Sequence, residues 1–211
     1  PLQVMDKYGT DALRFTMTAF AAPGRDVKYS DTLVENHRNF TTKLWNAAKF
    51  LEHHEATYSA DFDPSSLTLD VNRWVVAELI SCLESVEDAV KRYRFDDMAT
   101  ALYRFSWGTF CDWYIEFSKP ILFDGSDADK AETKATLGWV LGKSLHMLHP
   151  IIPFITEEIW QNLALNQGML ITNPWPLENV DRASFKNEKI QGQFNWVIDL
   201  VTSIRSIRNE V

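Results

Sequence analysis

The chain has 211 residues, of which 45% are hydrophobic and 13% aromatic, and its formal net charge is −8. A sequence of this size and composition can bury a core, which excludes an intrinsically disordered protein. The acidic balance excludes a uniformly basic nucleic-acid-binding surface but is compatible with a local basic patch. No apolar run is long enough for a transmembrane helix, so no membrane partner is expected.

The spacing of the apolar residues predicts helices along the whole chain. The expected helices cover residues 2–21 in two pieces parted at Tyr8 and Gly9, and then about 31–54, 70–93, 95–119, 128–148, 153–165 and 185–208. Ser30 or Asp31 is expected to cap the long helix that follows the turn at 21–26, and Asp70 the next one. Only residues 169–172 suggest a short strand. These features predict an all-α bundle of six to eight helices.

Several motifs resemble functional sites but have a simpler structural interpretation. GWVLGKS at 138–144 has one residue too few between its glycines for a phosphate-binding loop and lies mid-helix, which favours a close-packed glycine pair. His146 and His149 have no carboxylate or cysteine at ligand spacing, so we expect structural histidines. His53 and His54 are expected to be a solvated helix end, where an imidazolium suits the dipole.

The densest basic cluster, residues 91–94, has two equally weighted interpretations. It could clamp phosphates, or its cations could complement the negative end of a helix dipole.

Cys82 and Cys111 are the only cysteines, too few for a disulfide framework or a zinc site, so a reducing cytoplasm is expected. We find no catalytic constellation. The chain begins at Pro1 and ends within a helical pattern, which suggests part of a longer polypeptide.

One helix face combines residues suited to unpaired bases. In NFTTKLWNAAKF, residues 40, 44, 47 and 51 form an apolar stripe, while Asn39, Lys43, Asn46 and Phe50 form a second stripe beside it. Unpaired bases are bound by stacking on aromatic rings and by hydrogen bonds from amides and cations to their edges. The alternative is that Phe50 packs beneath a neighbouring helix and that Lys43 is simply solvated.

Several blocks of sequence resemble the helical anticodon-binding domain of class I valyl-tRNA synthetases, over nearly the whole chain. These blocks are YGTDALRF (8–15), PGRDVKY (23–29), NHRNFTTKLWNAAKF (36–50), RYRFDDMATALYRFSWGTFCDWYIEFSK (92–119), HPIIPFITEEIWQNL (149–163) and NPWP (173–176). DALRF and HPIIPFITEEIW are similar to blocks of the isoleucyl and leucyl enzymes as well. RNFTTKLWNAAKF and FCDWYIE carry most of the resemblance to the valine family.

The resemblance implies a role and a set of RNA-binding residues. Lys43 and Phe50 match family positions that touch anticodon bases, and Asn39 and Asn46 are added from helix geometry. Arg38 and Lys49, which lie near Trp45 across the helix, complete the candidate RNA-binding residues; we expect Trp45 to be an inter-helix anchor. Some family members carry an arginine eleven residues before the lysine, where this chain has Thr32, which puts that contact in doubt.

The resemblance also implies the organisation of the parent protein. Residues 1–30 would be connector helices leading from a catalytic domain, residues 31–165 the anticodon-binding bundle, and residues 166–211 a crossing segment and the start of a C-terminal region. The HIGH and KMSKS signatures that grip ATP are absent from the sequence, so no cofactor is expected in this fragment, and ATP and magnesium would belong to the parent ligase. The expected partners are a valine tRNA, through its anticodon loop, and valine and ATP through the catalytic domain. We expect a monomer.

Three alternatives remain open. The chain could be a helical scaffold between domains, with its aromatic residues at 103–117 as the interface, or a free-standing enzyme, which the missing nucleotide and nucleophile motifs disfavour. It could also be the same RNA-binding module from an isoleucyl- or leucyl-tRNA synthetase.

Overall fold

The computed structural model describes residues 1–22, 24, 29–164, 168–177 and 181–210, and within these ranges it contains helices and no strand. The α-helices are α1 (Leu2–Tyr8), α2 (Thr10–Phe20), α3 (Asp31–His53), α4 (Asp70–Lys91), α5 (Phe95–Tyr103), α6 (Ile115–Asp124), α7 (Asp127–Leu148), α8 (Pro153–Leu163) and α9 (Glu188–Glu210). The 3-10 helices are η1 (Pro64–Ser66), η3 (Leu170–Thr172) and η4 (Arg182–Phe185), and η2 (Arg104–Tyr114) is a π-helix. The predicted all-α fold is confirmed.

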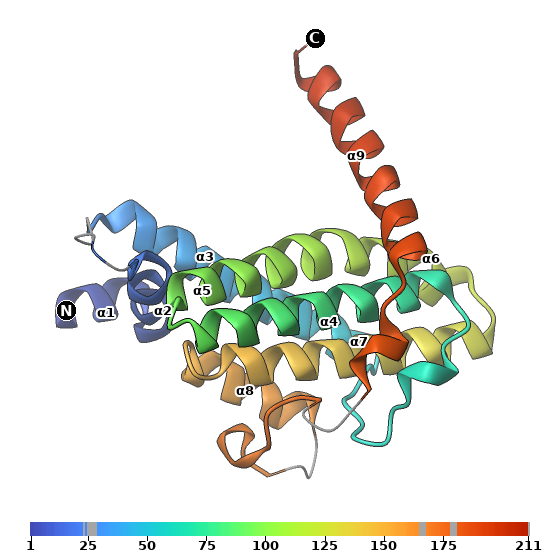
Figure 1. Ribbon diagram of the computed structural model, residues 1–211, viewed down its shortest axis with the longest axis horizontal. Coiled ribbons are helices and arrows are strands. Elements are labelled where there is room, and N and C mark those ends of the chain that lie inside the picture. Colours follow the sequence, from blue (N-terminus) through green and yellow to red (C-terminus); the bar gives the residue numbers. More distant parts are fainter. Residues whose placement is uncertain (23, 25–28, 165–167, 178–180, 211) are drawn as a thin grey trace.

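The long helices run side by side as a bundle (Figure 1). α3, α4, α7 and the continuous run α5–η2–α6 lie along its long axis, and α8 packs against α7 and α3. One large core lies between them, and its bulkiest fully buried side chains are Trp74, Trp160, Tyr114, Phe15, Phe40 and Phe110. Burying a large apolar side chain contributes about 1.5–3 kcal/mol, so this core supplies the main stabilisation of the bundle.

A smaller core joins the N-terminal helices to α3. Tyr8, Ala12 and Leu13 pack with Val34, so α1 and α2 share buried surface with the first turns of the long helix. The Asp11 carboxylate also accepts a 2.7 Å hydrogen bond from the Ile155 N–H, at the start of α8. An anion at a helix N-terminus is stabilised by the unpaired N–H groups and the helix dipole. The helices α1 and α2 are thus packed onto the bundle.

The two predicted helix caps have different outcomes. Ser30 caps α3 as predicted, because its Oγ accepts a hydrogen bond from the Leu33 N–H at 3.3 Å. Asp70 does not cap α4, because it is already the first helical residue. No side chain among the described residues caps α4; instead, the Glu132 carboxylate of α7 holds the two residues before the helix and accepts the N–H groups of Thr68 and Leu69 at 2.9 and 3.0 Å. Sequence spacing could not reveal this contact, since Glu132 belongs to a distant helix.

The aromatic-rich stretch predicted as one helix over 95–119 is a longer helical run that changes its winding. The run continues to Asp124, and its middle section η2 is a π-helix. Phe105 and Phe110, five residues apart, are both buried, which fits the wider π turn. Tyr114 is also buried, and its hydroxyl donates a 2.7 Å hydrogen bond to Asn72 of α4. The wider turn thus keeps three large rings directed into the core.

The C-terminal part of the chain first packs on the bundle, where Phe194 of the last helix stacks on Trp74 of α4, and then leaves it. The strand suggested at 169–172 is wrong, because Leu170–Thr172 form the 3-10 helix η3, where the Leu170 N–H donates to the Glu157 carboxylate at 3.1 Å. The last helix, predicted from 185, begins at Glu188 and projects away from the bundle towards the C-terminus (Figure 1).

Of the turn predicted at 21–26, Pro23, Arg25 and Asp26 lie outside the described residues. No helix in the described part of the chain is long and apolar enough to cross a bilayer.

Candidate nucleic-acid interface

α3 presents the two stripes that its sequence predicts. Phe40, Leu44, Ala47 and Leu51 are buried in the core. The neighbouring stripe is partly or fully open to solvent and faces the α5–η2–α6 run: Asn39 and Asn46 are exposed, and Lys43 and Phe50 are half-buried.

Lys43 is held between α3 and η2. Its Nζ forms an ion pair with Asp112 and lies 3.8 Å from the centroid of the Trp107 ring. The Lys43 side chain is 25% exposed, so the ammonium group is still within reach of solvent. A cation over an indole face is attracted by the ring quadrupole. Lys43 is therefore neither free in solvent nor sealed in the core, but fixed between α3 and η2 with one acidic and one aromatic neighbour.

Phe50 belongs to a row of rings that connects two helices. Its ring centroid lies 4.5 Å from that of His54, which in turn meets the Phe123 ring of α6 edge-on at 5.6 Å. We call Phe50, His54 and Phe123 the aromatic row. Burial, together with the charges of His53 and Lys134, lowers the pKa of His54. This shift of the pKa disfavours an imidazolium at His54, whose ring packs on Phe50.

The two amides on this face keep their hydrogen-bonding capacity. Neither the Asn39 nor the Asn46 side chain has a hydrogen-bond partner within the described part of the protein, and both residues are exposed. Each side-chain amide offers donors and an acceptor, the combination needed to bind the edge of a base.

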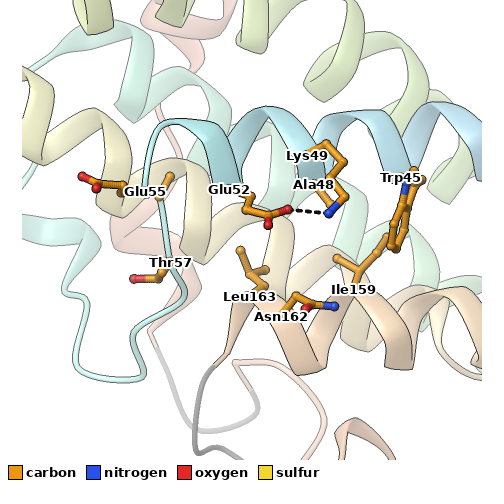
Figure 2. Close-up of a pocket in the computed structure, with 10 residues that line it drawn as sticks. Trp45, Ala48, Lys49, Glu52, Glu55, Thr57, Ile159, Asn162 and Leu163 are labelled. Atoms are coloured by element: carbon orange, nitrogen blue, oxygen red, sulfur yellow. Dashed lines mark hydrogen bonds and ion pairs between the residues drawn. The ribbon is translucent and has the colours of Figure 1, made fainter.

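The other two predicted cations, Lys49 and Arg38, do not belong to the stripe that contains Lys43 and Phe50. Lys49 donates a 2.6 Å hydrogen bond to Glu52 and lines a pocket of about 220 Å³ between α3 and α8 (Figure 2). Trp45 lines the same pocket, where its ring lies beside Ile159 of α8, which confirms its expected role as an inter-helix anchor. Arg38 pairs with Glu35 at 3.6 Å on the surface of α3. The structure therefore brings four of the six predicted residues to one flank and places Lys49 on the flank that faces α8.

The basic cluster at 91–94 is engaged by neighbouring acids. Arg92 pairs with Asp88 at 2.8 Å, and Arg94 with Asp96 at 2.7 Å and with Asp97 at 3.3 Å. The hydrogen bond from Arg94 lowers the pKa of Asp96 to about 2. A phosphate bound here would have to compete with these carboxylates, which favours the interpretation as a helix terminus.

The glycines and histidines of the 138–149 stretch, which resemble parts of functional motifs, contribute to packing and hydrogen bonding inside the fold. A Cβ at Gly138 would lie 2.0 Å from the carbonyl oxygen of Thr57, and one at Gly142 would lie 2.3 Å from the Tyr58 ring, which confirms the close-packed glycine pair. His146 Nδ1 donates to the Gly142 carbonyl at 2.7 Å. His149 Nδ1 lies 2.8 Å from the Thr156 hydroxyl. Both histidines are structural, as expected.

Sequence reasoning missed the partners of the predicted residues. Asp112 and Trp107 lie more than sixty positions from Lys43 in the chain, and Phe123 is equally remote from Phe50. The only available signal was the FCDWYIE block, which contains Asp112 but gives no hint of its contact with α3. Among the described residues, no three His, Cys, Asp or Glu side chains gather into a possible metal site.

The fold places this chain in the class of helical bundles found in class I aminoacyl-tRNA synthetases. It is similar, with a TM-score of 0.65, to the LeuRS chain in a ternary LeuRS–tRNA–LeuAMS complex of Agrobacterium radiobacter. The two chains are 18% identical, and the match covers 83% of this chain and 21% of the LeuRS chain. At this identity the likeness shows the fold alone.

The chain belongs to the family described as the anticodon-binding domain of tRNA ligase, whose profile matches residues 72–211. Over its whole length it is also similar to enzymes named valine–tRNA ligase. It is 47% identical to that of Cereibacter sphaeroides, 44% to that of Brucella suis and 39% to that of Bradyrhizobium diazoefficiens. The chain spans only 21%, 23% and 25% of the lengths of these relatives, respectively.

Proposed function

We propose that this chain recognises the anticodon loop of a valine tRNA, as the anticodon-binding part of an ATP-dependent valine–tRNA ligase. The similarity to valine–tRNA ligases over the whole chain supports the choice of amino acid. The observation that carries the RNA-binding role is the flank of α3, where two amides that have no partner among the described residues lie beside a positioned lysine and a half-buried aromatic ring.

Each residue of this flank has a distinct part in the proposal. Phe50 stacks on one unpaired base, an interaction that contributes about 1–3 kcal/mol per base. Lys43, oriented by Asp112 and Trp107, donates a hydrogen bond to a base edge, and Asn39 and Asn46 provide further donors and acceptors.

Arg38 and Lys49 have a lesser part in the proposal. Both are exposed but paired with glutamates, so they would contact the RNA backbone only by exchanging those partners. ATP, magnesium and valine would be bound by other parts of the parent enzyme. The two free cysteines, Cys82 and Cys111, agree with a reducing cytoplasm as the compartment.

A panel of anticodon stem-loops tests this function. The loops share one stem and differ only in the anticodon, which corresponds to valine, isoleucine or leucine, and binding is measured by filter titration. We expect the valine loop to bind most tightly. Equal binding to all loops would contradict anticodon reading, preference for another loop would change the amino acid, and no binding to any loop would favour an interdomain scaffold.

A further inference from the structure

An exposed aromatic ring lies at the end of α6. Phe123 is 62% exposed, although burying such a ring would be favourable. Single exposed apolar side chains are common on proteins and need no explanation by themselves. Phe123 differs because its ring contacts His54 at 5.6 Å, and His54 contacts Phe50 at 4.5 Å. The exposed ring is thus continuous with the proposed base-binding flank.

The chemistry of the aromatic row suits flat, apolar faces. His54 is half-buried and, as described above, is favoured in its neutral form, so the middle of the row adds little charge near neutral pH. Lys134, the cation near His54, pairs with Glu55 at 3.7 Å, and Phe123 is followed directly by Asp124. These carboxylates disfavour a phosphate and leave the ring faces as the available binding feature. Stacking on aromatic side chains tolerates any base, since every base has a π face.

We propose that the aromatic row extends the RNA site beyond Phe50, and that Phe123, supported by His54, stacks on a second unpaired base of the same loop. This inference rests on the proposed function, because its ligand is the loop bound at Phe50. The hydrogen-bonding amides and Lys43 are on α3, whereas no such donor belongs to the row beyond His54. The second base is therefore held without selection for its identity.

Three substitutions of Phe123 separate stacking from general apolar contact. In the 211-residue chain, we expect Phe123→Ala to weaken binding of the valine stem-loop about five- to a hundredfold. Phe123→Trp should retain the affinity, while Phe123→Leu, which keeps apolar bulk but has no ring, should lose most of it. The matched control is Phe154→Ala on α8, which removes a ring that is 64% exposed and belongs to another helix. The control should bind like the unmodified chain.

Fluorescence locates the second base. A fluorescent adenine analogue is placed at each loop position in turn, and its quenching is compared between the unmodified chain and Phe123→Ala. We expect one position to lose quenching only in the Phe123 variant, and changing the natural base there to leave the affinity nearly unchanged. Circular dichroism and thermal unfolding verify that each variant is folded.

The outcomes distinguish the two proposals. If Phe50→Ala weakens binding and Phe123→Ala does not, the extended site is wrong and the proposed function stands. If neither substitution matters, or the unmodified chain binds no stem-loop, the proposed function fails and this inference with it. Strong selection for one base at the Phe123-dependent position would also overturn the inference, as would a folded Phe123→Ala variant that binds RNA normally but loses a protein contact.

Discussion

α3 and α7 are of nearly equal length, and both carry polar residues in patterns that suggest function, but the structure uses them differently. In α7, Gly138, Gly142, His146 and Ser144 are buried, and the polar side chains among them bond to backbone carbonyls. In α3, Asn39 and Asn46 are exposed, and their side chains have no hydrogen-bond partner in the part of the chain that the structure describes. The difference teaches that a polar pattern indicates function only where its hydrogen-bonding groups remain unsatisfied within the fold.

The glycine pair gives the largest expected effect on the α7 side of this comparison. Gly138→Ala would place a Cβ 2.0 Å from the Thr57 carbonyl oxygen, so the backbone of the 54–58 loop would have to move. We expect a loss of about 3 kcal/mol in the free energy of unfolding, at the upper end of overpacking costs. Gly192→Ala in α9 is the matched control, because nothing lies within 4 Å of its Cβ position. There we expect a gain of about 0.5–1 kcal/mol from helix propensity. Urea unfolding of both variants checks this prediction, and equal effects would contradict it.

The buried His146 is expected to lower the free energy of unfolding in acid. Burial lowers its pKa from 6.5 to about 4 in the folded protein. Between these values the unfolded chain binds a proton that the folded chain does not, so the free energy of unfolding falls as the pH falls. We expect His146 to account for about 2 kcal/mol of this loss near pH 5.

The matched variant for this effect is His146→Asn, whose amide can replace the donor to Gly142. Urea unfolding near pH 7 and pH 5 should show a smaller acid-induced loss in the variant. If the pH dependence is unchanged by the substitution, His146 is not the group responsible.

Phe50 and Lys43 test the α3 side of the comparison. We expect Phe50→Ala or Lys43→Ala to weaken binding of the valine stem-loop by about 1–3 kcal/mol while helicity is retained, because each removes a direct contact with a base. Filter binding measures the affinity and circular dichroism the fold. Phe154→Ala, which removes an exposed ring on α8, should leave the affinity unchanged. Unchanged affinity in both α3 variants would make this face structural, like α7.

The ion pair between Lys43 and Asp112 gives the smallest expected effect. Both side chains are partly exposed, at 25% and 45%, so solvent screens their attraction. A double-mutant cycle of Lys43→Ala and Asp112→Ala, followed by urea unfolding, should give a coupling energy of about 0.2–1 kcal/mol. A coupling energy of several kcal/mol would show that Lys43 is retained for stability, and the contrast with α7 would weaken.

The sequence by itself determined the all-α class, most of the helix bounds, the core stripe of α3 and the close packing of the α7 glycines. These properties follow from local rules: apolar residues repeat with the helical period, and proline, glycine and capping residues mark helix ends. Helical spacing also indicated the candidate face on α3, the family resemblance implied the roles of Lys43 and Phe50, and comparison with known proteins confirmed the family.

Only the tertiary structure decided which side chains meet across helices. Glu132 binds the two residues before α4, Asp112 holds Lys43, and Phe123 of α6 meets His54. All of these contacts join residues far apart in the chain, and no periodicity encodes them. They depend on how the helices pack and, along η2, on a π turn that changes the direction of every side chain after it.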